Sequence, residues 1–448
     1  MGWELQRVAG RVRRPDPSAV HVDATDTSLT SVAGLVEFGA WARAAGVDRD
    51  LAATFHRLKP MSRWVVYPMG GQLRLLLDMF VAGEGRVFGV ESLAADALFL
   101  HLCGGSVPSP DVLYDDLNRF DEEAIVDAEA MVASHGLARA KAARLRTAHL
   151  DVDTTVEVLF GAQEGAVPGP NPRYPGRPSY HPVLIRLAEV NAVVGARLRP
   201  GDTGFGGEDV PQVTACIQRA RAALGEKCVL RVRIDGAGDC AELMEQVERE
   251  GAEYLTKAKM TPDLIGVLAA HKEWRTVDVD AFGKPTRQVA TVVFQRDVWR
   301  QRKMAVRVVA IRSCERDTGK QVYLWDEDWS AQAYLTSDWL ADEDDLAHEY
   351  NDRAGIEPLI AELKGPWALG KVPTGSFQAN HAGFLLKLLA FNLFRRFVDE
   401  RFAHLATWRT AWLRRVVVLR AGRLVRGPGR SRVLRSQPIA APVCPMRC

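Results

Sequence analysis

Three carboxylates in this sequence have the type and position needed for metal-assisted chemistry. Asp153 lies in the apolar, strand-like segment LDVDTTV, Asp235 ends the segment CVLRVRID, and Glu357 lies in the helical segment DDLAHEYNDRAGIEPLIAELK. Carboxylates that end neighbouring strands can meet at one edge of a sheet, where ligands commonly bind. Three acids gathered there without cations repel one another unless hard divalent ions bind them. Two such ions activate a water or hydroxyl for attack on a phosphodiester.

The residues around Glu357 strengthen this interpretation. Tyr350, Arg353, Glu357 and Lys364 lie on or near one stripe of a helix at 3.6 residues per turn. An acid flanked by two cations and a phenol suits a helix that holds a metal while it grips phosphates. The alternatives are a surface helix with ion pairs between successive turns and, for a single Asp at a strand end, a loop-capping role. Asp151, two positions before Asp153, shares its strand face and is predicted to support it.

The elements that must position these residues follow from the hydrophobic pattern. Residues 28–146 read as short helices, of which SLAADALFLHLCGGSVPSPDVLYDDLNRF resembles a helix-turn-helix with an acidic second helix. Strand and helix patterns then alternate, which indicates a mixed sheet flanked by helices in a multidomain α+β protein. The predicted units are an N-terminal arm (1–27), a helical DNA-binding domain (28–146), the sheet domain (147–269 and 338–375), a β-rich insertion (270–337), a helical C-terminal region (376–425) and a basic, disordered tail (426–448).

The charge of the chain is unevenly distributed. The net charge is +2, but the last 48 residues hold eleven arginines and no acid, which leaves 47 basic against 56 acidic residues before them. Such asymmetry suggests a polyanionic partner, and the segment ATWRTAWLRRVVVLRAGRL, with Arg414 and Arg415, is predicted to bind a DNA backbone. No segment has the apolar length of a membrane span or a secretory signal, so a cytoplasmic protein is expected.

The motifs together resemble those of one group of bacterial insertion-sequence transposases, which carry a DDE catalytic triad on an RNase H-like fold. The resemblance rests on the Tyr-Arg-Glu-Lys spacing, on LDVDTTV, on NPRYPGRPSYHP (171–182) with LRPGDT (198–203), and on RIDGAGD. It extends from about Ser28 to Phe402 with the same order and spacing. It implies a cut-and-paste DNA transposase that works through a hairpin intermediate.

The resemblance also assigns roles to single residues. Asp153, Asp235 and Glu357 match the catalytic triad that holds two Mg²⁺ ions, for which Mn²⁺ is an expected substitute. Tyr350, Arg353 and Lys364 match the residues that contact the transposon-end backbone. Trp325 or Trp329, in the β-rich insertion, is a candidate for stacking on a flipped base, with core packing as the alternative. The implied partners are terminal inverted repeats, target DNA and a second copy of the chain on paired ends, with no membrane.

The sequence departs from the family pattern at two places. Gly236, Ala237 and Gly238 follow Asp235 where relatives often place Ser-Gly-Phe or a charged run, so Asp239 is the alternative second ligand. Ala354 stands where some relatives carry a Trp that stacks.

Two rival functions share these motifs. One is an RNase H-like, structure-selective nuclease without transposition, and the other is a non-catalytic DNA-binding derivative of a transposase. The presence of all three acids and both cations counts against the second rival.

Overall fold

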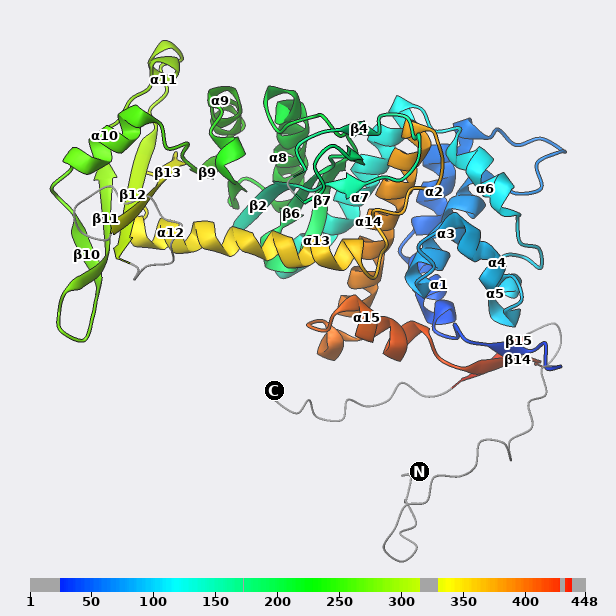
Figure 1. The fold of residues 1–448 in the computed structure, drawn as a ribbon. Coiled ribbons are helices and arrows are strands. Elements are labelled where there is room, and N and C mark those ends of the chain that lie inside the picture. Colours follow the sequence, from blue (N-terminus) through cyan, green and yellow to red (C-terminus); the bar gives the residue numbers. More distant parts are fainter. Residues whose placement is uncertain (1–24, 172, 315–328, 428–431, 437–448) are drawn as a thin grey trace, which may run out of the picture.

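A mixed sheet of nine strands runs through the molecule, and helices cover both of its faces (Figure 1). The computed structural model describes residues 25–171, 173–314, 329–427 and 432–436. The strand order is β10-β11-β12-β13-β9-β8-β2-β6-β7. In chain order the strands are β2 (Thr147–Thr154), β6 (Val183–Leu187), β7 (Ala192–Arg197), β8 (Val229–Ile234), β9 (Glu253–Lys257), β10 (Arg275–Val279), β11 (Pro285–Val292), β12 (Arg307–Cys314) and β13 (Trp329–Thr336).

Five of these strands form the mixed sheet that the sequence predicted, in the region where the resemblance implied an RNase H-like domain. The antiparallel strands β7, β6 and β2 lie side by side, and β8 and β9 then continue the sheet parallel to β2. β2 lies between β8 and β6 and is largely buried. Its apolar residues Leu150 and Val152 alternate along the strand with His149, Asp151 and Asp153, and these polar residues face a covering helix. This alternation puts the three polar side chains on one face of the sheet.

The β-rich insertion is part of the same sheet. β13 pairs antiparallel with the edge of β9, with Leu335 opposite Thr256, and β12, β11 and β10 follow outward. An open strand edge is a template for further pairing, which explains why the insertion extends the sheet instead of folding as a second layer. The strands that the structure describes in region 270–337 therefore belong to the same hydrogen-bonded sheet as the RNase H-like strands.

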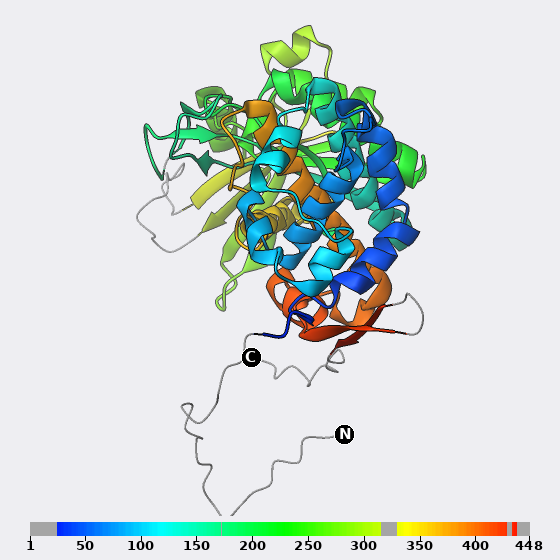
Figure 2. The same ribbon diagram turned by 90° about the vertical axis from the view of Figure 1, so that its right-hand side faces the viewer.

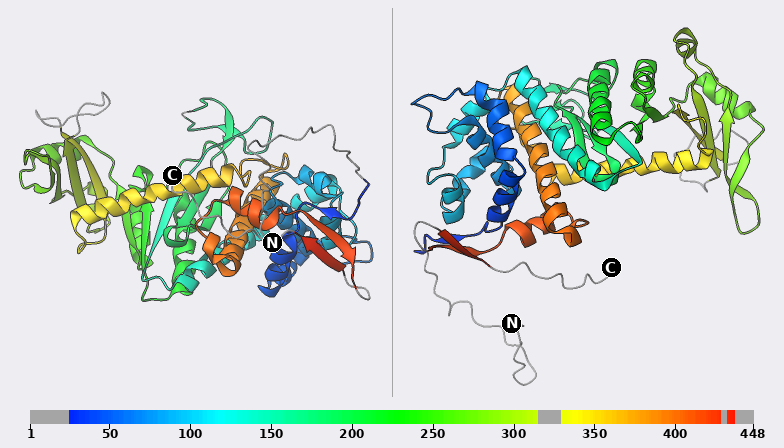
Figure 3. Two further views of the ribbon diagram at one scale, coloured as in Figure 1. Left: turned by 90° about the horizontal axis from the view of Figure 1, so that it is seen from below. Right: turned by 180° about the vertical axis from the view of Figure 1, so that it is seen from behind.

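Helices cover the two faces of the sheet differently. Above it in Figure 1 lie α8 (Val210–Leu224) and α9 (Ala241–Arg249), while the opposite face is crossed by α12 (Glu343–Asn351), a 3-10 turn at Asp352–Gly355 and α13 (Ile356–Lys364). In Figure 3 these last three segments form one nearly continuous rod from the insertion to the RNase H-like strands. Two short helices, α10 (Pro262–Ala270) and α11 (Asp297–Gln301), accompany the outer strands.

The N-terminal helices share one hydrophobic core with the long helix α14 (Phe377–Arg401). These helices are α1 (Leu35–Ala44), α2 (Val47–Phe55), α3 (Met69–Ala82), α4 (Val90–Leu93), α5 (Ala97–Leu102), α6 (Pro110–Leu117) and α7 (Glu122–Ala143). Ser109 caps α6, whose first residue is Pro110. Buried polar residues of α14 form hydrogen bonds within the protein, as Asn392 does by donating to Val132 O and Val193 O. Within the described residues, no helix is both long and apolar enough to cross a bilayer.

The C-terminal region corrects two sequence expectations. The predicted helix within 376–425 ends early: after α14 come α15 (Thr410–Leu413), a π-helical turn to Val418 and the strand β14 (Gly422–Arg426). Part of the predicted disordered tail is ordered, because β15 (Arg432–Ser436) pairs with β14, which pairs in turn with β1 (Leu29–Thr30). This small sheet joins the two ends of the described chain (Figure 2). Pairing with residues almost 400 positions away leaves no local sequence signal.

Candidate active site

Two of the predicted carboxylates lie side by side at the ends of adjacent parallel strands. β2 and β8 pair with Val152 opposite Ile234, so Asp153 and Asp235 come next in register. Asp153 accepts a hydrogen bond from the Thr154 amide (2.8 Å), and Asp235 caps a 3-10 turn by accepting from the Ala237 amide (2.9 Å). Burial raises the pKa of Asp153, and the neighbouring charge of Asp235 raises it further. These two acids therefore form a site of concentrated negative charge.

The rod formed by α12 and α13 brings a cation to this site. A guanidinium nitrogen of Arg353, Nη1, lies 3.4 Å from Asp153 Oδ2, and this charge lowers the pKa of Asp153 against the effect of burial. The same guanidinium lies 5.8 Å from the ring centre of Tyr350, which packs 4.7 Å from the ring of Tyr334. Tyr350 and Arg353 thus face the strand ends.

Lys364 and Glu357 lie further along the rod. Lys364 Nζ donates to Val156 O (2.8 Å) and lies 3.2 Å from Glu157 Oε1, so it holds the segment that leaves β2. Glu357 lies one turn beyond Arg353 and is exposed. Among the residues that the structure describes, no three His, Cys, Asp or Glu side chains are close enough to hold a metal ion. The structure therefore brings two of the three predicted acids together, and Arg353 compensates their charge.

The geometry distinguishes Asp235 from the alternative ligand Asp239. The Asp239 carboxylate is buried, lies 2.5 Å from Arg296 Nη1 and accepts a hydrogen bond from the Lys259 amide (2.6 Å). These contacts tie the turn after β8 to the segment after β9, which is a structural role. Gly238 permits that turn, because a Cβ there would lie 2.6 Å from Ile234 Cβ. Asp235 instead follows Ile234 at the end of β8, next in register to Asp153.

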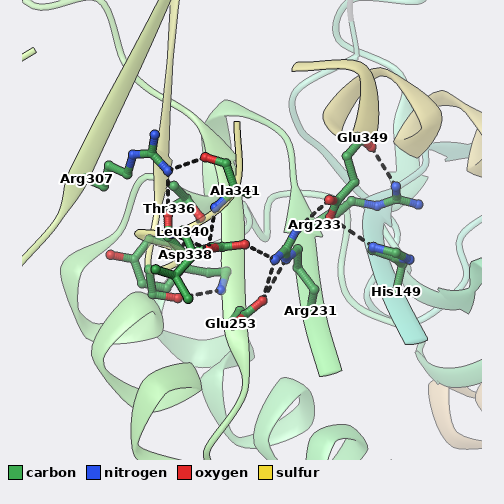
Figure 4. Close-up of polar contacts among 12 residues, drawn as sticks. His149, Arg231, Arg233, Glu253, Arg307, Thr336, Asp338, Leu340, Ala341 and Glu349 are labelled. Atoms are coloured by element: carbon green, nitrogen blue, oxygen red, sulfur yellow. Dashed lines mark hydrogen bonds and ion pairs between the residues drawn. The ribbon is translucent and has the colours of Figure 1, made fainter. Parts of the chain in front are cut away.

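A network of ion pairs fixes the rod on the sheet below these acids (Figure 4). Arg231 on β8 binds Glu349 of α12 together with Glu253 and Asp338. His149 on β2 bridges Glu349 (2.9 Å) and Glu189 (2.5 Å). Burial alone would lower the pKa of His149, but the hydrogen bonds with the two glutamates raise it to about 9.

Asp151 belongs to this network and lies on the same face of β2 as Asp153. Its carboxylate is wholly buried and accepts from Arg233 Nε (2.6 Å) and Arg186 Nη1 (3.0 Å). Arg233 also donates to the Glu349 carbonyl (2.6 Å). Sequence reasoning missed the arginines and Glu349, although a signal exists. Arg231 and Arg233 alternate with apolar residues ahead of Asp235, which places all three on one strand face.

Of the two tryptophans that were candidates for stacking on a flipped base, the structure describes Trp329. Trp329 is 4% exposed and packs under the Arg312 guanidinium, 4.7 Å from the ring centre, so its face is covered. Core packing, the alternative given above, is what the structure shows for Trp329. Trp325 lies outside the described residues.

The predicted DNA-binding arginines of the C-terminal region differ from each other. Arg414 is buried, donates to Val81 O (3.1 Å) and Phe80 O (2.6 Å), and stacks 4.2 Å from the Trp367 ring centre. The expectation of a DNA contact at Arg414 is therefore wrong, because its donors are used inside the fold. Arg415 is exposed and lies 5.2 Å from the ring centre of Trp412, so its role in DNA binding stays a prediction.

Comparisons with known proteins identify the family of this chain. The family model "Transposase DDE domain group 1" matches residues 13–440. Among solved structures, the fold is similar to a piggyBac transposase in a synaptic complex with hairpin DNA, solved by cryo-electron microscopy. That match has a TM-score of 0.44 and 10% sequence identity, and covers 85% of this chain and 78% of that one. No curated protein matches the sequence. Because the family model spans nearly the whole chain, the protein belongs to the DDE transposases of domain group 1.

Proposed function

We propose that this DDE transposase moves a bacterial insertion sequence by a cut-and-paste reaction, with Asp153, Asp235 and Glu357 as its catalytic carboxylates. The observation that carries the proposal is the pair of acids at the ends of β2 and β8, over which the rod holds Arg353. Glu357 follows Arg353 by one helical turn, and residues four apart on a helix lie about 5–6 Å from each other. The proposal requires that α13 bring Glu357 to the same strand ends when the metal ions bind.

The residues present fit a divalent cation. The donors are carboxylate oxygens, the ligands that Mg²⁺ prefers, and the pKa of Asp153 is raised by burial and by the Asp235 charge. A cation bound between the two acids would relieve that repulsion. We propose two Mg²⁺ ions, or Mn²⁺ in their place, which when bound would supply Lewis-acid activation of the attacking and leaving oxygens.

The residues of the rod would position the DNA. Arg353 would exchange its contact with Asp153 for a phosphate when the acids are neutralised, and Tyr350 would pack beside that phosphate. Lys364, held near the end of β2 by Val156 O, would bind a phosphate further along the same strand. Exposed Arg415 would add a backbone contact from the C-terminal region.

In the proposed reaction, water attacks a phosphodiester at the element's end, and the phosphorus–oxygen bond to the 3′ oxygen breaks to leave a free 3′-OH. That hydroxyl then attacks the opposite strand and forms a hairpin while it releases the flanking DNA. After the hairpin is reopened, the 3′-OH joins target DNA. Because two ends must be cut and joined together, we propose a homodimer on paired ends, acting at the bacterial nucleoid.

The test is cleavage of a duplex that carries the terminal inverted repeat found beside the gene. Asp235→Asn should abolish Mg²⁺-dependent cleavage while the protein still binds the duplex in a gel shift. The matched control is Asp263→Asn, since Asp263 is an exposed acid at the start of α10, and it should cleave normally. Full cleavage by Asp235→Asn would exclude the proposed acids. Joined product in a plasmid target distinguishes a transposase from a nuclease on the same fold.

A further inference from the structure

A cavity of about 360 Å³ lies beside the candidate active site. Among the residues that were proposed above to bind DNA or metal, Lys364 is the one that lines it. Its wall combines two aromatic rings, Phe160 and Tyr174, with three cations, Arg177, Lys364 and Lys371. The volume is in the range of pockets that hold small organic molecules. A second cavity of about 520 Å³ is also lined by Phe160 and Lys371, so the two cavities are neighbours.

The aromatic rings of this cavity are unusually accessible. Phe160 is 85% exposed, and the Arg177 guanidinium lies 5.6 Å from its ring centre. Tyr174 is 45% exposed and has the Arg173 guanidinium 5.5 Å from its ring centre. Leaving a phenylalanine in water is unfavourable, and an exposed ring with an arginine beside it is the combination on which single-stranded nucleic acids stack.

The cations of the cavity give it a positive charge. Lys364 is compensated by Glu157, but within the part of the chain that the structure describes, Arg177 and Lys371 form no ion pair. Both side chains are exposed, so they are available to a phosphate. The cavity therefore offers aromatic faces and uncompensated cations in one place, which matches a nucleotide and does not match a cationic or purely apolar ligand.

The position of the cavity relates it to the reaction. Phe160, Tyr174 and Arg177 belong to the segment that follows β2, which carries Asp153, and this segment forms the small strands β3 (Glu157–Val158), β4 (Val167–Pro168) and β5 (Pro178–Tyr180). Lys364 ends α13, seven residues after Glu357. At 1.5 Å per helical residue this separation is about 10 Å, or roughly three nucleotides at duplex spacing.

We infer that this cavity binds an unpaired nucleotide of the DNA strand next to the cleavage site, with the base stacked on Phe160 or Tyr174. Arg177, Lys364 and Lys371 would hold the adjoining phosphates. The inference rests on the proposed function, since it assumes that DNA is the substrate. It places at this cavity the point where the cleaved strand separates from the duplex. It also replaces the stacking role that the sequence suggested for Trp329, whose face is covered.

The first experiment measures binding of two short oligonucleotides to the full-length protein by fluorescence anisotropy. The probes are a thymidine octamer and an abasic octamer with the same number of phosphates. Wild type should bind the thymidine octamer at least about fivefold more tightly, which is the lower end for one base on an aromatic ring. Phe160→Ala with Tyr174→Ala should remove that preference and leave abasic binding unchanged. Arg177→Ala with Lys371→Ala should weaken both probes.

The matched control is Phe282→Ala, because Phe282 is 93% exposed on the turn between β10 and β11, far from this cavity. The control should bind both octamers as wild type does. Equal binding of the two probes by wild type, or the same loss in the Phe160 and Phe282 variants, would overturn the inference. Quenching of 2-aminopurine placed in the octamer gives a second readout on wild-type protein, so a poorly folded variant does not decide the outcome.

This outcome is separable from the proposed function. Wild-type cleavage of the inverted-repeat duplex together with equal octamer binding would retain the transposase and reject the pocket. Octamer preference without cleavage of the duplex would support a nucleotide-binding pocket and reject the proposed reaction.

Discussion

Replacing Asp151 by Asn should separate the structural from the catalytic role of the two acids on β2. The Asp151 carboxylate is 0% exposed and accepts charge-assisted hydrogen bonds at 2.6 Å from Arg233 and at 3.0 Å from Arg186. Asn keeps the shape but removes the charge, so two guanidiniums stay buried without it. Removing one partner of a buried ion pair costs roughly 3–5 kcal/mol of stability. This is a large part of the roughly 5–15 kcal/mol typical of a domain.

The same substitution at Asp153 should behave in the opposite way. Asp153 has one guanidinium at 3.4 Å and the repelling charge of Asp235 beside it. Because Asn removes both the attraction and the repulsion, we expect a change within about 1 kcal/mol, the range of modest ion pairs. Asp153→Asn should nevertheless lose cleavage, whereas Asp151→Asn should still cleave at a temperature where it is folded.

The assay is urea unfolding followed by tryptophan fluorescence, combined with cleavage of the inverted-repeat duplex. The midpoint of Asp151→Asn should fall well below that of Asp153→Asn, which should unfold as wild type does. If Asp151→Asn is as stable as wild type and inactive, the carboxylate acts in the reaction and the assignment of a supporting role is refuted.

Other expectations follow from the same contacts. The fold raises the pKa of His149 from the ordinary value of 6.5 to about 9, so the protonated imidazole contributes roughly 3 kcal/mol to stability below pH 6.5. This contribution should be lost as the pH rises through about 9. His149→Gln should flatten the profile of unfolding free energy against pH. Asp239→Asn should lower the thermal midpoint, whereas Asp235→Asn should leave it unchanged in differential scanning calorimetry. Arg414→Ala should destabilise the protein in the same assay, because its donors bind buried carbonyls. Arg415→Ala should leave stability intact and reduce the salt dependence of duplex binding by about one unit of log–log slope.

The local patterns of the sequence were sufficient for the strands that carry the site. Alternation in HLDVDTTV and CVLRVRID predicted β2 and β8, and their ends correctly placed Asp153 beside Asp235. The choice between Asp235 and Asp239 needed the structure, because the cation that occupies Asp239 is Arg296, which lies 57 residues later on another element. Spacing on one helix predicted that Arg353 and Glu357 share a stripe, but not that Arg353 pairs with Asp153 while Glu357 is exposed.

Nonlocal pairing explains the errors in the C-terminal region. The segment RVLRS is short and basic, and by composition alone it favours a disordered tail. It becomes a strand only because β14 offers an edge, and β14 itself pairs with Leu29 and Thr30 near the start of the chain. Such contacts depend on where α14 and α1 place the two ends, which local pattern does not encode.

The charge asymmetry of the sequence acquires a different meaning once the partners of the charges are known. Arg414 and Arg420 are buried, and Arg420 donates to Glu37 at 2.6 Å, so these members of the arginine-rich end serve the fold. Among the acids of the body, Asp151 and Asp239 are likewise neutralised by arginines inside the protein. A charge that is already paired and buried cannot recruit DNA or a metal ion without a large energetic cost. The charges available for function are therefore those at the strand ends, along the rod and around the Phe160 cavity, where burial is partial and a phosphate or cation can replace the partner.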